Sequence, residues 1–465
     1  MATLGPATER PGVLEGMVQA GLDVARLNMS HGTPEFHARM AARVRAAARA
    51  AERPLGVMVD LQGPKVRLGA FAGALAVSPG DEVTLTTRVS ATDLPGHVLP
   101  VDYRHLPVET AAGQTLLLAD GAVRLEVLKI TGQRVQCRVL EGREIPPRAG
   151  LALPEAKVVR SALTAKDRRD LELAVQLNAD FVALSFVRRA HDLQEARRHI
   201  ERLGGDQALV AKIETRAALR CLDEVLGASD AVMVARGDLG VELPPERVPI
   251  EQKRIIEACN AAGKPVITAT QMLESMRHAS RPTRAEASDV ANAVLDGSWA
   301  VMLSAETATG EFPVESVAML DRIAREAEPI LLRSVRRRGG PRAIADVSEG
   351  IAEAGVMVAF EVGARALVAL TRSGATACQV ARFLPAIPAY GYTSSRRTLA
   401  RMTLYRGITP RYLPEQPNLE AAIDRVEQDL KVRRNLGRGD RIVVLGGSPR
   451  KPAGITDRLI VHMSR

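Results

Sequence analysis

The sequence predicts an α/β protein dominated by a barrel of eight parallel strands and eight helices. Short apolar runs, typical of strands buried on both faces, alternate with segments of helical periodicity in two stretches, 1–67 and 161–330. Counting a very short first run there are eight such strands, and the two stretches hold about 240 residues, close to the roughly 250 of a (β/α)₈ or TIM barrel. Between and after them the pattern changes, so we expect an inserted domain at 68–160 and a C-terminal domain at 331–465.

The first three barrel strands are expected near residues 3–6, 23–30 and 54–60. The first of these segments fits only the end of a strand, and a helical segment follows it as far as Ala20. A second helical segment, rich in Ala and Arg, covers about 34–52. The second and third strands finish in polar residues: Arg26, Asn28, Ser30 and Asp60.

The segment 68–160 has a different residue pattern. Helical periodicity disappears, and short runs rich in Val and Thr alternate with Gly and Pro, for example at 82–87, 114–119, 123–127 and 134–139. This pattern predicts a small antiparallel β domain, a β-barrel inserted into the larger barrel.

Five more barrel strands are expected at 181–187, 208–211, 231–235, 265–271 and 300–306. In a barrel of this type the carboxyl ends of the strands form the active face. Here those ends carry a set of polar residues: Ser185, Lys212, Glu214, Asp238, Thr270 and Glu306.

Lys212, Glu214 and Asp238 are the most informative of these residues. Lys212 and Glu214 are two positions apart, so their side chains point to the same side of the strand. One cation and two carboxylates at one mouth suit a divalent metal ion together with an anionic substrate. The alternative is three solvated charges where apolar strands reach the surface. The recurrence of polar residues over seven strand ends favours the site.

The C-terminal segment begins with a basic stretch containing Gly and Pro, 331–345, which we expect to be a linker or an exposed loop. The apolar runs 366–370 and 441–445 then predict buried strands of a further α/β domain. Each run leads into a loop of small and polar residues, at 371–376 and 446–454.

The amino-acid composition limits the kinds of function that the protein can have. The net charge is +9, but the basic residues are dispersed, which favours small phosphorylated ligands over nucleic acid. The four cysteines form no C-x-x-C pair, so a reducing, cytoplasmic location is expected and zinc ribbons are not. We expect neither a signal peptide nor a membrane span, because no apolar run has the required length.

Seven blocks on the strand ends resemble the pyruvate kinase family, in order and along nearly the whole chain. They are LGPAT at 4–8, VARLNMSHG at 24–32, DLQGPKVR at 60–67, AKIE at 211–214, MVARGDLG at 233–240, GKPVITATQMLESM at 263–276 and RPTRAEASDVANAVLDG at 281–297. The resemblance implies transfer of a phosphoryl group from phosphoenolpyruvate to ADP, giving pyruvate and ATP, the last step of glycolysis. It also implies that the inserted domain closes over the barrel as a lid.

The resemblance implies a role for each charged residue of the predicted mouth. Glu214 and Asp238 would hold Mg²⁺ or Mn²⁺. The Lys212 ammonium would lie against the transferring phosphoryl group, where electrostatic stabilisation matters most. Gly237, Asp238 and Thr270 would bind the substrate. Thr270 is also a candidate in the proton path to the enolate carbon, and a chain of water molecules is the competing candidate.

The same resemblance implies a set of phosphate and nucleotide contacts. Arg26 would bind the transferring phosphoryl group, and Arg67 the nucleotide phosphates or the phosphoryl group in flight. Asn28 and His31 lie where the family contacts nucleotide, although His31 could equally be an orienting hydrogen-bond partner. The family's Lys-Lys-Gly segment is missing at 143–154, where Arg148 is the candidate replacement for a nucleotide-contacting lysine.

One departure concerns potassium. Members of the family that need K⁺ have Thr and Glu where this chain has Leu61 and Lys65, and these two residues match the subgroup that does not need K⁺. The physical reason is that an ammonium can supply the positive charge of a bound K⁺. Asn28, Ser30 and Asp60 would remain as polar scaffolding of that pocket, with Lys65 as its cation.

In the C-terminal domain the resemblance implies allosteric regulation by a sugar phosphate. The expected phosphate loop comprises Thr371, Ser373, Gly374 and Thr376, with Arg450 and Lys451 approaching from the other loop. The alternative is a tight strand-to-helix turn without a ligand. The family is usually homotetrameric. Two other functions stay open at this stage: a lyase or aldolase acting on pyruvate through a metal-bound enolate, and a regulatory or nucleic-acid-binding relative without catalysis.

Overall fold

Eight parallel strands form the central sheet of the protein, in the order β1-β2-β3-β13-β14-β15-β16-β17. The computed structural model describes residues 1–87, 97–154, 162–337, 346–447 and 454–465. The sheet closes on itself because Ala2 bridges Leu303, next to the last strand, and Thr3 N donates to Leu303 O at 3.0 Å. The predicted (β/α)₈ barrel is therefore confirmed. Its strands are β1 (Ala2–Thr3), β2 (Val24–Asn28), β3 (Gly56–Asp60), β13 (Phe181–Leu184), β14 (Ala208–Ile213), β15 (Ala231–Ala235), β16 (Val266–Ala269) and β17 (Ala300–Met302).

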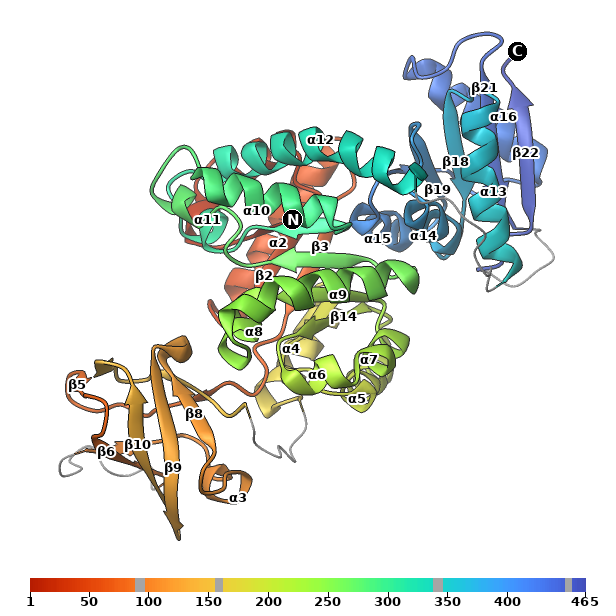
Figure 1. Ribbon diagram of the computed structural model, residues 1–465. Helices are drawn as coiled ribbons and strands as arrows, with labels where there is room; N and C mark the ends of the chain where they lie inside the picture. The colour runs from red at the N-terminus through yellow and green to blue at the C-terminus, as the bar shows by residue number, and fades with distance from the viewer. Residues whose placement is uncertain (88–96, 155–161, 338–345, 448–453) are drawn as a thin grey trace.

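Helices surround the barrel strands and cover their apolar outer faces (Figure 1). Several begin at a threonine whose hydroxyl accepts a backbone N–H, including Thr33, Thr164, Thr215 and Thr283, and such caps stabilise the first turn. The barrel helices are α1 (Val13–Gln19), α2 (Pro34–Ala50), α4 (Ala165–Gln176), α5 (Ala190–Arg202), α6 (Arg216–Arg220), α7 (Leu222–Ala228), α8 (Arg236–Glu242), α9 (Val248–Ala261), α10 (Arg284–Leu295), α11 (Ala305–Ala308) and α12 (Pro313–Arg337).

The inserted domain is a seven-stranded sheet in the order β4-β12-β8-β9-β10-β6-β7, with a core of its own. Its pairs are antiparallel as predicted, except that β6 and β7 pair in parallel. A bridge between Leu68 and Val101 links the two edges of this sheet. The strands are β4 (Val66–Arg67), β6 (Glu82–Thr86), β7 (Val98–Pro100), β8 (Thr115–Leu118), β9 (Val123–Thr131), β10 (Arg134–Glu141) and β12 (Gly150–Ala152). Its first strand, β4, carries Arg67 and begins two residues before the expected domain boundary.

The C-terminal domain is a five-stranded sheet in the order β20-β19-β18-β21-β22, parallel except for β22. It lies on the opposite side of the barrel from the inserted domain (Figure 1). Within the described ranges, no helix combines the length and apolar character needed to cross a membrane. The elements are α13 (Val347–Glu361), β18 (Ala366–Leu370), α14 (Ala375–Arg382), β19 (Ala389–Thr393), α15 (Arg396–Arg401), β20 (Ile408–Tyr412), α16 (Leu419–Val432), β21 (Arg441–Gly446) and β22 (Arg458–Met463).

The interior of the barrel changes character along its axis. At the amino ends of the strands, apolar residues such as Val24, Ala208 and Ala231 form one buried cluster. Leu404, from the 3₁₀ helix η5 (Met402–Leu404) after α15, belongs to the same cluster and is 2% exposed. The C-terminal domain therefore fills the amino end of the barrel. Arg26 and Lys212, which follow Val24 and Ala208 by two and four positions on the same side of their strands, lie toward the carboxyl end.

Replacement of Leu404 by alanine should lower the free energy of unfolding by about 2–5 kcal/mol, because it leaves a cavity between two domains. Amide exchange at the start of β14 should accelerate as well. Leu436→Ala is the matched control, since Leu436 is also buried, at 5% exposure, but lies in the core of the C-terminal domain alone. Chemical denaturation with hydrogen-exchange mass spectrometry measures both effects. Unchanged exchange in the barrel would show that Leu404 does not support it.

Candidate active site

Lys212 is the centre of a buried charge cluster at the carboxyl ends of the barrel strands. It is the penultimate residue of β14, and only 8% of its surface is exposed. Its Nζ lies 2.6 Å from Ser185 Oγ, 2.8 Å from Glu214 Oε1 and 3.2 Å from Asp60 Oδ1. Burial alone would lower the pKa of Lys212, but the charges of Asp60 and Glu214 outweigh it and raise that pKa. The ammonium is therefore held charged.

Asp60 joins Lys212 to a second cation, Arg26. Arg26 Nε donates to Asp60 Oδ2 at 2.7 Å, and Nη1 donates to Thr3 Oγ1 at 2.9 Å. Burial would raise the pKa of Asp60, yet Lys212 and Arg26 hold it below its ordinary value. Asp60 is the last residue of β3, so one carboxylate positions a cation from β2 and a cation from β14.

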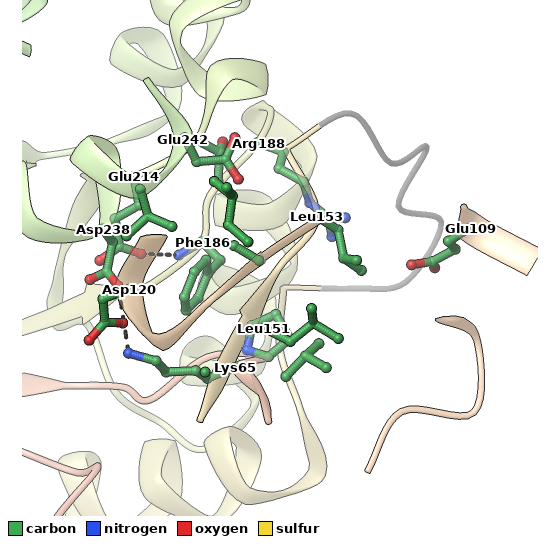
Figure 2. A pocket seen from close by; sticks show the side chains of 17 residues that line it. Lys65, Glu109, Asp120, Leu151, Leu153, Phe186, Arg188, Glu214, Asp238 and Glu242 are labelled. Atoms are coloured by element: carbon green, nitrogen blue, oxygen red, sulfur yellow. Dashed lines mark hydrogen bonds and ion pairs between the residues drawn. The ribbon is translucent and has the colours of Figure 1, made fainter. Parts of the chain in front are cut away.

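Glu214 and Asp238 place two carboxylates at the mouth of the barrel (Figure 2). Glu214 is buried, and its Oε2 accepts a hydrogen bond from Phe186 N at 2.7 Å. Asp238 lies in the first turn of α8 and is 35% exposed. Burial raises the pKa of Glu214 and the charge of Asp238 adds to that rise, against the opposing effect of Lys212.

This pair of carboxylates fits a hard divalent cation. Two like charges near each other are stabilised by a cation, and their oxygens are the donors that Mg²⁺ prefers. Among the described residues no group of three His, Cys, Asp or Glu side chains converges as a metal cage. Mg²⁺ commonly takes only one or two carboxylates and completes its shell with water and substrate oxygens, so two ligands suffice.

Lys65 has a neighbour that the sequence did not suggest. Its Nζ lies 3.7 Å from Asp238 Oδ1, across the cleft between the inserted domain and the barrel (Figure 2). The residues of the expected potassium pocket have other partners. Asp60 pairs with Arg26 and Lys212, and Asn28 Oδ1 accepts a hydrogen bond from Ser30 N at 3.1 Å. Leu61 is buried, and its carbonyl accepts a hydrogen bond from Ser185 Oγ. Lys65 therefore adds its charge on the Asp238 side of the mouth.

Thr270 follows β16 directly and has a left-handed backbone conformation, with φ at +71°. For a β-branched residue such a conformation costs about 1–3 kcal/mol, and it persists only where the surroundings enforce it. The Gly237 N–H donates to Thr270 Oγ1 at 2.9 Å, so the two predicted substrate-binding residues are in direct contact. Gln271, at +52°, and Phe186, at +54°, share this conformation at the same end of the barrel.

The predicted nucleotide contacts come from two domains. Asn28 ends β2 and His31 is exposed in the loop that follows it, where its carbonyl lies 2.8 Å from His37 Nε2. Arg67 is exposed on β4 of the inserted domain, and its Nη1 donates to Arg148 O at 3.3 Å. Arg148 thus contacts Arg67 through its backbone.

Two residues contribute to the site although the sequence predicted no role for them. The sequence placed Ser185 at a polar strand end without a role. The structure shows that its hydroxyl connects Lys212 to Leu61 O. Thr3, in the short first strand, orients Arg26. Glu306, in contrast, is a strand-end carboxylate that caps backbone amides: its oxygens accept from Leu273 N at 3.0 Å and Ser304 N at 2.6 Å.

The expected phosphate loop of the C-terminal domain forms a turn before α14. Gly374 has φ at +92°, a conformation that favours glycine, and its N–H donates to Thr371 Oγ1 at 2.9 Å. Ser373 Oγ accepts weakly from Ala375 N at 3.5 Å, and the hydroxyls of Thr376 and Thr456 lie 2.7 Å apart. Thr371 and Thr376 line a pocket between the loops after β18, β19, β20 and β21. Arg450 and Lys451 lie outside the described residues.

Comparison with known proteins agrees with this geometry. Residues 1–317 match the family model described as "Pyruvate kinase, barrel domain", and residues 349–462 match "Pyruvate kinase, alpha/beta domain". A pyruvate kinase of Agrobacterium vitis is 40% identical over 465 residues, covering 99% of this chain and 95% of that protein. Pyruvate kinases of Mycobacterium tuberculosis and Corynebacterium glutamicum are also 40% identical, over 99% and 100% of this chain and 97% and 96% of their own.

Proposed function

This chain belongs to the pyruvate kinase family, and we propose that the charge cluster around Lys212 is where it transfers the phosphoryl group of phosphoenolpyruvate to ADP. The products are pyruvate and ATP, and the reaction is the last step of glycolysis. The observation that carries the site assignment is the buried cluster in which Arg26 and Lys212 share Asp60 and Lys212 also pairs with Glu214. The full-length similarity favours this reaction over a lyase, an aldolase or a non-catalytic relative.

We assign the metal site to Glu214 and Asp238. A Mg²⁺ or Mn²⁺ ion held there would supply positive charge to the carboxylate and enolate oxygens of the substrate. Lys212 supports the same chemistry from the protein side, because its buried ammonium is fixed by three partners and needs no reorganisation as charge develops. Arg26 adds a guanidinium for the phosphoryl oxygens.

Thr270 and Gly237 hold the other side of the substrate. The Gly237 N–H donates to Thr270 Oγ1, and a substrate carboxylate would replace that hydroxyl as its acceptor. Thr270 presents a hydroxyl beside it and is a candidate donor or relay for the proton that the enolate carbon takes up. Arg67, Asn28 and His31 would bind the nucleotide when the inserted domain closes.

A coupled assay tests the proposal. With phosphoenolpyruvate, ADP and Mg²⁺ the protein should form pyruvate, which a second enzyme reduces so that its formation can be measured. Mn²⁺ should support the reaction in place of Mg²⁺. Removal of the metal with a chelator should abolish turnover reversibly. Release of pyruvate that needs no ADP would instead indicate a different reaction class.

Turnover should not depend on potassium. In Na⁺ or Tris buffer, addition of K⁺ should change kcat by less than about twofold, since the ammonium of Lys65 already supplies a cation beside Asp238. Lys65→Glu should lower kcat without K⁺ by roughly tenfold or more, because it places a third carboxylate at the metal site. Lys129→Glu, which makes the same change on an exposed face of β9, is the control. A strong K⁺ requirement of the unmodified enzyme would contradict the assignment.

We also propose that a sugar phosphate regulates the enzyme at the loop of Thr371, Ser373, Gly374 and Thr376. The support is the pocket that Thr371 and Thr376 help to line and the amide-rich turn that leads into α14. We also propose a homotetramer. Exposed apolar residues support it, such as Met357 on α13 and Val461 and Met463 on the edge strand β22.

We propose a cytoplasmic location as well, because the reaction is glycolytic and the four cysteines are free.

A further inference from the structure

Arg236 begins α8 but turns its guanidinium toward the loop after β16. The side chain is 10% exposed. Nε donates to Ala269 O at 3.3 Å, while Nη2 donates to Thr270 O at 2.5 Å and to Gln271 O at 3.3 Å. One guanidinium therefore binds three successive carbonyls of a single loop.

The backbone of this loop is strained. Thr270 and Gln271 both have positive φ, at +71° and +52°, and neither is a glycine. Two consecutive residues in this conformation need an external constraint, because the steric cost favours a return to the ordinary backbone regions. The three carbonyls bound by Arg236 belong to these residues and to Ala269 just before them, so the guanidinium supplies that constraint.

Asp289 fixes the guanidinium from the other side. Arg236 Nη1 lies 2.8 Å from Asp289 Oδ1 and 2.7 Å from Oδ2. Asp289 is in the middle of α10, a twelve-residue helix with a capping box at Thr283 and Glu286. The constraint on the loop is thus anchored in a regular helix and not in another loop.

We infer that Arg236, held by Asp289, is a positioning residue that keeps Thr270 in the left-handed conformation, with its hydroxyl beside the Gly237 amide. The competing role is direct binding of a substrate carboxylate or phosphate. The geometry disfavours it, because Nε, Nη1 and Nη2 all donate to Asp289 or to loop carbonyls. The kinetic part of this inference rests on the proposed function of Thr270; the conformational part does not.

The first test is a double-mutant cycle. Arg236→Lys keeps the charge but loses the planar fork that reaches the loop and Asp289 together. We expect kcat to fall roughly 10–100-fold, with the KM for phosphoenolpyruvate within about threefold of the unmodified value. Thr270→Ala should cost at least as much, and Arg236→Lys combined with Thr270→Ala should match Thr270→Ala alone within about twofold. Additive effects, or a raised KM with unchanged kcat, would overturn the inference.

The second test does not depend on turnover. Hydrogen exchange of the peptide covering 269–277 should be at least about tenfold faster in Arg236→Lys than in the unmodified chain, while exchange in β14 stays the same. Asp289→Asn should show the same change to a smaller degree, which keeps the test decisive if the Arg236 variant does not fold. Arg254→Lys, on the exposed side of α9, is the control and should change neither kcat nor exchange. Unchanged exchange of the loop in both site variants would refute the positioning role, whereas an inactive unmodified enzyme would refute the proposed function alone.

Discussion

Lys212→Met should lower kcat by roughly 1,000-fold or more, the largest effect that we expect from any single substitution. The ammonium is the cation at the centre of the cluster, and a preorganised charge of this kind is worth about 10²–10³-fold for one donor, with more expected when the donor is fully charged. The substitution also leaves Asp60 and Glu214 without a shared cation, so part of the loss will come from a disturbed site.

The measurement should separate these contributions. Circular dichroism and denaturation report whether the variant is folded, and kcat is then expressed per folded molecule. Lys253→Met is the control, because Lys253 also forms an ion pair, with Asp296, but is 56% exposed. If Lys212→Met retains near-normal turnover, Lys212 does not stabilise the transferring group. If the variant is inactive in vitro but its cellular role is intact, a non-catalytic function would be indicated.

Asp60→Asn should have the second largest effect, on activity and stability together. Loss of the carboxylate charge leaves Arg26 and Lys212 close together without their common anion. Breaking a buried ion pair from one side typically costs about 3–5 kcal/mol. We expect the free energy of unfolding to fall by about that amount and kcat to fall by roughly 100-fold, because both cations lose their fixed positions.

Asp180 offers a matched control for Asp60. It is also a buried aspartate with an arginine partner, Arg45, at 2.9 Å, and it accepts from Val57 N at 2.8 Å. However, it lies just before β13, at the amino end of the barrel and away from the charge cluster. Asp180→Asn should therefore reduce stability while leaving kcat per folded molecule unchanged. If Asp60→Asn behaves in the same way, Asp60 is structural and not a positioning residue.

Much of the barrel could be predicted because buried parallel strands leave a strong signal. Runs such as 208–211 are apolar without interruption and end abruptly in charge at Lys212. The first strand was predicted only as the end of a strand near residues 3–6, and the structure has two residues of it, Ala2–Thr3. The parallel pairing of β6 with β7 was missed, since alternation within a strand does not identify the direction of its partner.

The site could be predicted as a set of residues but not as a network. Strand ends indicated Lys212, Glu214 and Asp238, yet nothing in the sequence shows that Lys65 lies beside Asp238. The backbone conformation of Thr270 is likewise invisible, because local preferences argue against a positive φ at threonine. The pairing of Arg236 with Asp289 joins residues far apart in sequence, and only the assembled fold brings them into contact.

The position of Leu404 in the barrel interior bears on the order in which the protein is made. The last barrel strand ends at Met302, whereas Leu404 is synthesised about 100 residues later, roughly 5–20 s at ordinary rates of translation. During that interval the amino end of a nearly complete barrel is open to water. The nascent chain therefore exposes the apolar cluster around Val24, Ala208 and Ala231 until the C-terminal domain has emerged, and it is in this interval that binding by a chaperone would matter most.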